Sequence, residues 1–478
     1  MTHDVVIIGG GSAGYAAART ARDEGADVGI IDHGPLGGLC ILRGCMPTKT
    51  ILRSSDVMSL MNRAKEFGLK PVSAKADLAA IISRKARLIE EFADDRIHAL
   101  KDSRFTLYEE RAAFLSPHEV QAGPHKLTAD AFIISTGSVV ARIPLPGLED
   151  VGYLTSDEAL ELRDVPRSMI VLGGGPVALE LAQFFQRIGT VVTLIQRSAH
   201  VMSQGDEDLA RPVEARFREE GMTVLTNSRL HRFTQDGTKK TAHLTHDGKE
   251  KTVSADVILQ ALGRRPNIDR LNVEAARIEV RQGKIAVDDT MRTSQPHVYA
   301  VGDVNGLHEI VHIAIQQGEI AGWNAMHPQA APRRYDDRLK AQVVFTDPQI
   351  AGVGLSEKEC RSREIPYRVA SYPFDDHGKS LTLGEKHGHV KLLASPENGE
   401  ILGAHIVGPE AAELIHELIA VMYYRGTVHD LVRMPHYHPT LAEIVTYPAE
   451  ELAGRLDPGP VVQGTDHSID LSTDEVHP

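Results

Sequence analysis

Cysteine is scarce in this sequence, which has three cysteines among 478 residues. So few thiols cannot form the disulfide framework of a secreted protein this large, which indicates a reducing compartment and an expected cytoplasmic location. Two of them, Cys40 and Cys45, are separated by four residues in the glycine-bounded stretch GGLCILRGCMPTK. In a reducing compartment a close cysteine pair more often carries out chemistry than holds a fold, so this pair is the first candidate site.

Long hydrophobic runs and excess positive charge are also missing. No apolar stretch approaches the ~20 residues of a membrane span, and the opening MTHDVVIIGGGSAG is not typical of a signal peptide. The net charge of −13, from 52 basic and 65 acidic residues, argues against a general nucleic-acid binder, which needs a basic face. We therefore expect a globular protein of two to four domains with neither a membrane nor a nucleic acid as its partner.

A strand, a glycine turn, a helix and a second strand follow one another in DVVIIGGGSAGYAAARTARDEGADVGIID. The expected strands are 5–8 and 28–31, and the second ends at Asp32. The pattern G-x-G-x-x-G is supplied by Gly9, Gly11 and Gly14. Such glycines let backbone N–H groups approach a pyrophosphate at a helix N-terminus, and the acid can take ribose hydroxyls. This segment predicts a dinucleotide site.

The same pattern recurs in SMIVLGGGPVALELAQFFQRIGTVVTLIQRS, with expected strands at 169–172 and 191–195. Its turn positions are Gly173, Gly175 and Ala178. A nucleotide-fold unit without a ligand is the alternative interpretation. Two such fingerprints in one chain suggest two dinucleotides, one bound permanently and one exchanging.

Three shorter strand–glycine turns lie at 134–138, 261–267 and 298–304, and they contain Gly137, Gly263 and Asp303. After about residue 340 the pattern changes. A hairpin is expected over 391–408 and an amphipathic helix over 411–426, which indicates an α+β domain. The polar, acidic stretch 455–478 is expected to be a mobile tail.

Five motifs in order make this chain resemble the flavoprotein disulfide reductases: GGGSAG, GGLCILRGCMPTK, GGGPVALE, AVGDV and HPTLAE. The resemblance covers residues 4–453 and is strongest to dihydrolipoyl dehydrogenases. It implies an α/β fold with two Rossmann-like dinucleotide-binding domains, for FAD and NAD(P), and a C-terminal α+β dimerisation domain that forms a homodimer. The implied parts are the FAD domain at 1–145 and 266–338, the NAD(P) domain at 146–265, the interface domain at 339–454 and the tail at 455–478.

The resemblance also assigns roles to the cysteine motif. Cys40 would be the interchange thiol that meets the substrate, and Cys45 the charge-transfer thiol beside the flavin. Lys49 would pair with Glu180 and place positive charge where reduced flavin becomes negative. The alternatives are a structural disulfide for the cysteines and an ordinary surface lysine. Cys360 has no partner motif and is expected to be an ordinary thiol.

In relatives, the HPTLAE motif acts across the dimer interface. His438 would be the general base for the substrate thiol at the other subunit's Cys40, and Glu443 would orient its imidazole. His436 matches a second histidine of dihydrolipoyl dehydrogenases. The implied FAD contacts are Gly9, Gly11, Gly14, Asp32, Lys49, Gly137, Asp303 and Ala314, and the implied NAD(P) contacts are Gly173, Gly175, Ala178, Gln196, Arg197 and Gly263.

Some positions depart from the family pattern. Gln196 stands where NAD-using relatives carry Glu, and Arg197 where NADP-using relatives place a phosphate-binding arginine, which favours NADP. Ser203 stands where NADP-using relatives carry a second such arginine, and this argues against NADP. Arg43 adds a positive charge between the cysteines and either lowers a thiol pKa or is solvated. No metal site is expected.

The leading hypothesis is a dihydrolipoyl dehydrogenase-like enzyme whose substrate is a small dithiol or a lipoyl-carrying protein. The runner-up is an NADPH-dependent reductase of another small disulfide or polysulfide. A flavin-bound scaffold with a vestigial redox loop is a third. The absence of a cysteine pair in the tail argues against mercuric reductase and large thioredoxin reductase activity.

Overall fold

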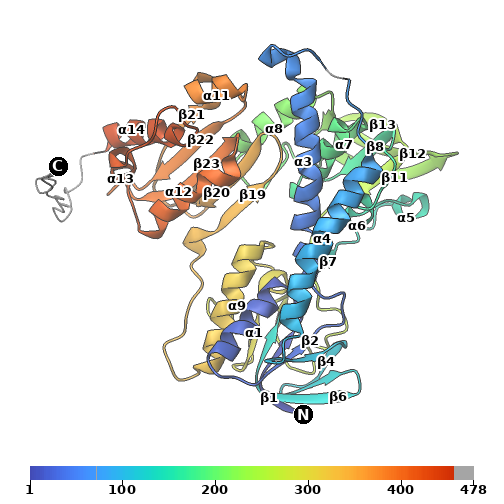
Figure 1. The fold of residues 1–478 in the computed structure, drawn as a ribbon, viewed down its shortest axis with the longest axis vertical. Coiled ribbons are helices and arrows are strands. Elements are labelled where there is room, and N and C mark those ends of the chain that lie inside the picture. The colour runs from blue at the N-terminus through green and yellow to red at the C-terminus, as the bar shows by residue number, and fades with distance from the viewer. Residues whose placement is uncertain (72, 457–478) are drawn as a thin grey trace, which may run out of the picture.

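The computed structural model describes residues 1–71 and 73–456. Figure 1 shows three bodies, a lower one that holds the N-terminus, an upper right one and an upper left one. The expected α/β class is confirmed, since each of the first two bodies contains parallel strands with helices and an antiparallel sheet with helices forms the third. Of the tail expected at 455–478, residues 457–478 lie outside the described residues.

The lower body is built on a seven-stranded sheet with the order β3-β2-β1-β6-β5-β4, in which β18 also pairs with β6. The strands are β1 (Thr2–Ile8), β2 (Val28–Ile31), β3 (Thr106–Tyr108), β4 (Ala112–Ser116), β5 (Glu119–Ala122), β6 (His125–Ile134) and β18 (Val298–Ala300). β1, β2, β3, β6 and β18 run parallel, while β4 and β5 form an antiparallel extension. The pairing of β18 with β6 joins segments more than 160 residues apart in one sheet, so this body draws on two pieces of the sequence.

Helices α1 (Ser12–Asp23) and α9 (Val311–Met326) pack tightly against each other on this sheet. Small residues allow the close approach: a Cβ atom at Gly318 would lie 2.3 Å from the carbonyl oxygen of Ala13. The alanine-rich face of α1 is therefore needed to bring the late helix α9 over the first glycine turn.

Two long helices, α3 (Cys45–Asn62) and α4 (Leu78–Leu100), run from the lower body to the upper ones (Figure 1). The side chain of Asp77 caps α4 by accepting a hydrogen bond from the Ala80 N–H at 2.9 Å. The short helix α2 (Gly38–Leu42) packs against both. This arrangement places the cysteine motif where the lower body meets the upper right one.

The upper right body has a parallel sheet in the order β10-β9-β8-β14 and a separate antiparallel sheet in the order β11-β12-β13. Its elements are β8 (Ser168–Leu172), α7 (Pro176–Arg187), β9 (Val191–Ile195), α8 (Glu207–Glu219), β10 (Thr223–Leu225), β11 (Ser228–Asp236), β12 (Lys239–His246), β13 (Lys249–Ala255) and β14 (Val257–Gln260). The predicted strand 191–195 has the observed bounds of β9. Strand β7 (Ser138–Val140) pairs with β15 (Arg264–Pro266), so the chain enters and leaves this body side by side.

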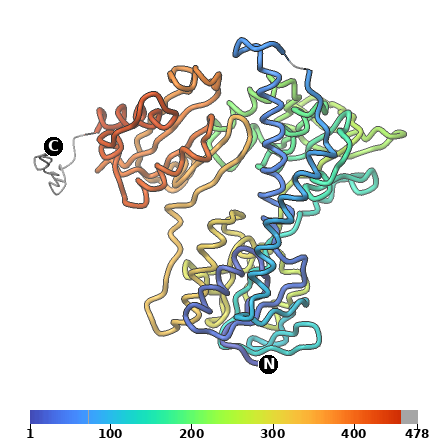
Figure 2. The backbone as a smooth tube through the Cα atoms, viewed as in Figure 1, coloured from blue at the N-terminus to red at the C-terminus, as the bar shows by residue number. Residues whose placement is uncertain are grey.

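The upper left body is a five-stranded antiparallel sheet in the order β19-β20-β23-β22-β21, covered by helices. Its elements are β19 (Ala341–Val344), β20 (Gln349–Gly354), α10 (Glu357–Ser362), β21 (Arg368–Pro373), α11 (Gly378–Leu383), β22 (His389–Ala394), β23 (Ile401–Gly408), α12 (Ala411–Tyr423), α13 (Val428–Arg433) and α14 (Thr446–Arg455). The hairpin and the helix expected here are confirmed as β22–β23 and α12. Figure 2 shows the chain crossing to this body from the end of α9.

The remaining short α-helices and strands are α5 (Leu148–Val151), α6 (Ser156–Ala159), β16 (Val280–Arg281) and β17 (Lys284–Ile285). The 3-10 helices are η1 (Ala64–Phe67), η2 (Gly302–Asn305), η3 (Asp337–Leu339), η4 (Phe374–Asp376) and η5 (Ala442–Val445). Among residues 1–71 and 73–456, no helix is both long and apolar enough to cross a membrane.

Candidate active site

The cysteine motif lies directly against the first glycine turn. Cys40 is in α2, and Cys45 is the first residue of α3. A Cβ atom at Gly38 would lie 2.8 Å from the Cα of Gly11, so only a residue without a side chain allows this approach. The thiols and the first dinucleotide fingerprint therefore form one site.

The two thiols are reduced in this structure, and their pKa values are shifted in opposite directions. A hydrogen bond from the Cys40 thiol lowers the pKa of Cys45 to about 7, and the positive charge of Lys49 adds to this effect against the opposing burial. The start of α3 contributes in the same direction, because a helix N-terminus favours a thiolate. The pKa of Cys40 is raised well above its usual range, because its thiol donates the shared hydrogen bond and is buried. Cys45 is therefore the thiolate of the pair near neutral pH.

Lys49 and Glu180 meet across the boundary between two bodies. The Lys49 Nζ donates to both carboxylate oxygens of Glu180, at 2.8 and 3.0 Å. Lys49 follows Cys45 by four residues, so both lie on one face of α3. Phe345 completes the arrangement: its backbone N–H donates to Glu180 at 2.9 Å, and its ring centroid lies 4.6 Å from the Lys49 Nζ. A buried carboxylate thus holds the ammonium group beside the cysteine motif.

The first glycine turn has the features that a dinucleotide phosphate requires. A Cβ atom at Gly14 would lie 1.8 Å from the carbonyl oxygen of Gly9, so the helix can begin here only with glycine. No side chain caps the N-terminus of α1, which leaves its N–H groups available to an anion. Asp32, at the end of β2, accepts hydrogen bonds from Gly10 N–H at 2.6 Å and from Gly34 N–H at 2.8 Å. Its remaining lone pairs can accept ribose hydroxyls, so these residues fit the ADP half of FAD.

The other residues implied for FAD surround this turn. Gly137 lies three residues after the end of β6, and Ser138 donates to the Asp303 carboxylate at 2.6 Å. Ala314 lies in the first turns of α9 and is buried. The structure thus brings together all the first-fingerprint residues, the cysteine motif and the start of α9.

The second fingerprint forms a similar turn in the upper right body. A Cβ atom at Gly173 would lie 2.4 Å from the Ala261 carbonyl oxygen, two residues before Gly263. Ala178 is fully buried, and no side chain caps α7 at Gly175. This turn can accept a second pyrophosphate.

Two residues that bear on coenzyme choice directly follow strand β9. The Gln196 side chain lies over Gly174 and accepts a hydrogen bond from the Arg197 N–H at 3.0 Å. The Arg197 side chain is exposed and has no ion pair among residues 1–71 and 73–456. An unpaired guanidinium at this position is free to meet a phosphate.

A histidine–carboxylate pair lies in the upper left body. The Nδ1 of His438 lies 2.8 Å from Glu443, and this hydrogen bond lowers the pKa of Glu443 although burial opposes it. His438 itself is 77% exposed, whereas Glu443 is buried. The ring of His436 binds Glu417 at 2.7 Å, so this histidine has a different acidic partner.

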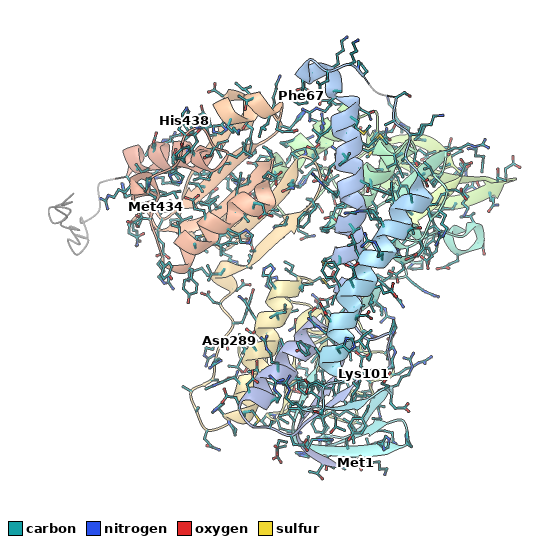
Figure 3. The ribbon with its side chains drawn as sticks, in the orientation of Figure 1. Met1, Phe67, Lys101, Asp289, Met434 and His438 are labelled. Atoms are coloured by element: carbon teal, nitrogen blue, oxygen red, sulfur yellow. The ribbon has the colours of Figure 1, made fainter. Side chains whose placement is uncertain are left out.

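The histidine pair and the cysteine motif lie apart within one chain. His438 is on the outer side of the upper left body in Figure 3, whereas Cys45 is the first residue of α3, a helix outside that body. In the described part of the chain, no hydrogen bond or ion pair joins His438 or Glu443 to either cysteine. A site that uses both groups therefore requires a second subunit.

Sequence reasoning missed several residues that support these groups. His377 is buried, and its Nε2 lies 3.4 Å from Glu443, so Glu443 stands between two imidazoles. Gln183 exchanges two hydrogen bonds with the backbone of Asp347, at 2.7 and 2.8 Å, and so fixes the loop that carries Phe345. No local motif marks either residue, because each contact joins segments far apart in the sequence.

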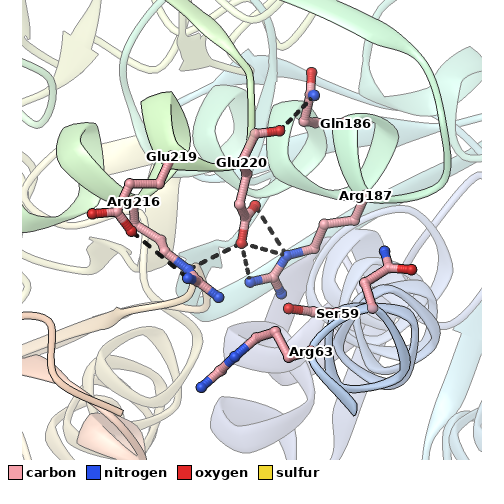
Figure 4. A pocket seen from close by; sticks show the side chains of 8 residues that line it. Ser59, Arg63, Gln186, Arg187, Arg216, Glu219 and Glu220 are labelled. Atoms are coloured by element: carbon pink, nitrogen blue, oxygen red, sulfur yellow. Dashed lines mark hydrogen bonds and ion pairs between the residues drawn. The ribbon is translucent and has the colours of Figure 1, made fainter. Parts of the chain in front are cut away.

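Arg187 also holds the loop that carries Phe345. It pairs with Asp347. It also pairs with Glu220 beside a cavity of about 270 Å³ between α3, α7 and α8 (Figure 4). The other arginines that line this cavity, Arg63 and Arg216, also have acidic partners. Neither cysteine lines it, so this cavity is a structural junction beneath the loop and not the active site.

Comparison with known families identifies the fold and chemistry. Residues 3–318 match the family described as pyridine nucleotide-disulphide oxidoreductase, and residues 340–449 match its dimerisation domain. The chain belongs to this family. It is therefore a flavoprotein oxidoreductase that uses FAD and NAD(P)H, and its dimerisation domain indicates a homodimer.

Relatives of this oxidoreductase differ in substrate. Dihydrolipoyl dehydrogenase of Bacillus subtilis (strain 168) is 34% identical over 424 residues, which span 87% of this chain and 92% of the relative. Mercuric reductase of Staphylococcus aureus is 32% identical over 416 residues, which span 87% and 76%. Among solved structures, LpdA from Mycobacterium tuberculosis has a TM-score of 0.84 at 28% identity and covers 94% of this oxidoreductase. The Cu(II) complex of RclA from Escherichia coli, with a TM-score of 0.83 at 23% identity and 95% coverage, shows the fold alone.

Proposed function

We propose that this flavoprotein oxidises a small dithiol, or a dihydrolipoyl group on a carrier protein, and passes the electrons to NAD(P)⁺. The observation that carries the proposal is the low pKa of Cys45 beside the Lys49–Glu180 pair, directly against the first glycine turn. A thiolate at this place is what electron exchange between a cysteine pair and a bound flavin needs. The HPTLAE motif, which places His438 on Glu443, favours the dihydrolipoyl branch.

The proposed reaction assigns a step to each protein group. A substrate thiolate attacks Cys40 in the Cys40–Cys45 disulfide, and Cys45 leaves as the thiolate. The second substrate thiol then attacks the mixed disulfide, which releases oxidised substrate and leaves both cysteines reduced. His438 of the second subunit accepts the substrate proton, and Glu443 holds the resulting imidazolium. FAD, when bound, supplies the transfer of two electrons from the dithiol to the nicotinamide.

The coenzyme preference is part of the proposal. Gln196 can bind ribose hydroxyls without repelling a 2′-phosphate, and the exposed Arg197 can meet that phosphate. One exposed charge-assisted contact contributes only ~1–3 kcal/mol. We therefore expect NADP(H) to be accepted, with NAD(H) close behind.

A second candidate is an NADPH-dependent reductase of another small disulfide. The Gln196–Arg197 pair favours it, because dithiol oxidation in the dihydrolipoyl branch generally uses NAD. Relatives named mercuric reductases are nearly as similar as those named dihydrolipoyl dehydrogenases, so Hg(II) also belongs among the substrates to be tested.

Anaerobic titration of the oxidised holoenzyme distinguishes these functions. Dihydrolipoamide, NADH and NADPH are compared as reductants, and small disulfides and Hg(II) as acceptors. Rapid flavin reduction by dihydrolipoamide, together with turnover to NAD(P)⁺, supports the proposal. Reduction by NADPH alone, followed by transfer to a disulfide, would favour the second candidate. A flavin that no dithiol reduces would indicate the third hypothesis, a flavin-bound scaffold with a vestigial redox loop.

A further inference from the structure

Helix α4 holds a half-buried cation that has no acidic partner in the described part of the chain. Arg96 stacks its guanidinium over the ring of Tyr15, with 4.4 Å between the Cζ atom and the ring centroid. Its Nη1 is buried and has no hydrogen-bond partner among residues 1–71 and 73–456, and no carboxylate there lies within 4.0 Å. Burying a guanidinium nitrogen without an acceptor is costly, so such groups are normally paired.

This cation lies near the reactive thiol region. α4 packs against α2, which carries Cys40, and Tyr15 lies one turn into α1 from the first glycine turn. Burial lowers the pKa of Arg96, while negative charge on Tyr15 or on Cys40 would raise it, so Cys40 is near enough to interact with the guanidinium. The other arginine on this side of α1, Arg19, is already paired with Glu319 at 2.8 Å. The Arg96 guanidinium is therefore available to bind an anionic group.

We propose that Arg96 binds a carboxylate on the substrate that reacts at Cys40, and so selects anionic disulfides and dithiols over neutral ones. The inference rests on the proposed function and narrows it to a small dithiol that carries a free carboxylate, because a lipoyl group on a carrier protein is amide-linked and has none. Tyr15 holds the guanidinium in place by stacking. The substrate carboxylate supplies the acidic partner that the half-buried guanidinium lacks among the described residues, in a charge-assisted bond.

Alkylation in a Cys45→Ser background tests the inference without turnover, because removing the Cys45 thiolate removes the main cause of the raised Cys40 pKa. Iodoacetate and iodoacetamide differ by one charge, and mass mapping follows the modification of Cys40 by each. Arg96→Met should lower the iodoacetate-to-iodoacetamide rate ratio at Cys40 by roughly tenfold or more. Arg96→Lys should keep part of the ratio. Arg87→Met is the matched control, because Arg87 is on the same helix but is exposed and paired with Glu91.

Turnover with NAD(P)H gives the second measurement. The acceptors are 5,5′-dithiobis(2-nitrobenzoate), which carries two carboxylates, and the neutral 4,4′-dithiodipyridine. Arg96→Met should raise the KM for the first by roughly ten- to a hundredfold and leave the KM for the second within about twofold. Equal effects on both acceptors would overturn the inference.

Two further outcomes keep the inference separate from its alternatives. If Arg96→Met loses bound FAD, Arg96 serves the cofactor and the inference is wrong. A Cys45→Ser protein that shows no preference for iodoacetate, or a wild type that shows none for the anionic disulfide, refutes the inference without any Arg96 variant. A wild type that reduces neither disulfide and is not reduced by dihydrolipoamide would refute the proposed function itself.

Discussion

Replacing Cys40 with alanine should raise the pH at which Cys45 ionises. In the reduced protein the Cys40 thiol donates to Cys45, and this hydrogen bond is the largest cause of a Cys45 pKa of about 7. Alanine cannot donate. Lys49 and the start of α3 remain and still favour the thiolate, so the pKa should rise by about one unit and not return to its full ordinary value.

The size of this change can be worked out at one pH. At pH 7.5 a group with a pKa of about 7 is roughly three-quarters thiolate, and one with a pKa of about 8 is roughly one-quarter thiolate. The sign follows from the lowered pKa: the thiolate is present above the midpoint and is lost as the pH falls through it. Serine at position 40 keeps an O–H donor, so Cys40→Ser should titrate closer to the wild type than Cys40→Ala does.

Two measurements follow the Cys45 thiolate. The long-wavelength thiolate-to-flavin band is recorded against pH in the reduced wild type and in the two Cys40 variants, where it should be visible above the midpoint without prior reduction. Alkylation of Cys45 by iodoacetamide over the same pH range is independent of the flavin. Cys360 is an internal control, because burial raises the pKa of its thiol. Identical midpoints in wild type and Cys40→Ala, or a band that survives Cys45→Ser but not Cys40→Ser, would refute the assignment of the thiolate to Cys45.

Further predictions concern the base, the dimer, the coenzyme and the loop. His438→Ala should slow dithiol oxidation roughly 10²–10⁴-fold and spare NAD(P)H-to-dye activity, and equal losses would show a structural role. When inactive Cys40→Ser subunits are mixed with inactive His438→Ala subunits, the heterodimers should regain activity, because each contains one intact shared site. No recovered activity after confirmed subunit exchange would exclude a shared site. Arg197→Ala should weaken NADP(H) selectively, whereas a wild type that prefers NAD(H) more than about a hundredfold, with no selective effect, contradicts this. Gln183→Leu should cost about 2–4 kcal/mol in unfolding free energy and shift the Cys45 midpoint, whereas Gln186→Leu should leave that midpoint unchanged.

The sequence was sufficient where function depends on backbone geometry within a short segment. The spacing of the glycines in both fingerprints predicted strand–turn–helix units, and the observed strands β2 and β9 have the predicted bounds. Their Cβ contacts explain why: at Gly14 and Gly173 any side chain would collide with a backbone carbonyl. Such constraints leave a local trace in the sequence that can be read without the fold.

Contacts between distant segments leave no comparable local pattern in the sequence. The pairing of Phe345 N–H with Glu180 joins positions 165 residues apart, and His377 reaches Glu443 from another loop. Nothing in the residue types around Arg96 showed that its guanidinium would be half-buried without an acidic partner in the described part of the chain. These features depend on how the bodies dock, and docking is determined by side-chain packing over the whole chain.

Helix α7 contributes both to the second glycine turn and to the Lys49–Glu180 pair beside the cysteines. The N-terminus of α7 is the turn that can receive the coenzyme pyrophosphate, and Glu180 lies about 6 Å further along its axis, where it holds Lys49. Gln183 and Arg187 follow at helical spacing on the same side, and both hold Asp347 in the loop that donates to Glu180. A displacement of this loop would therefore change the charge beside Cys45 before it changed either glycine turn. For this reason the Cys45 pH midpoint, and not coenzyme affinity, should be the most sensitive measure of damage to the loop.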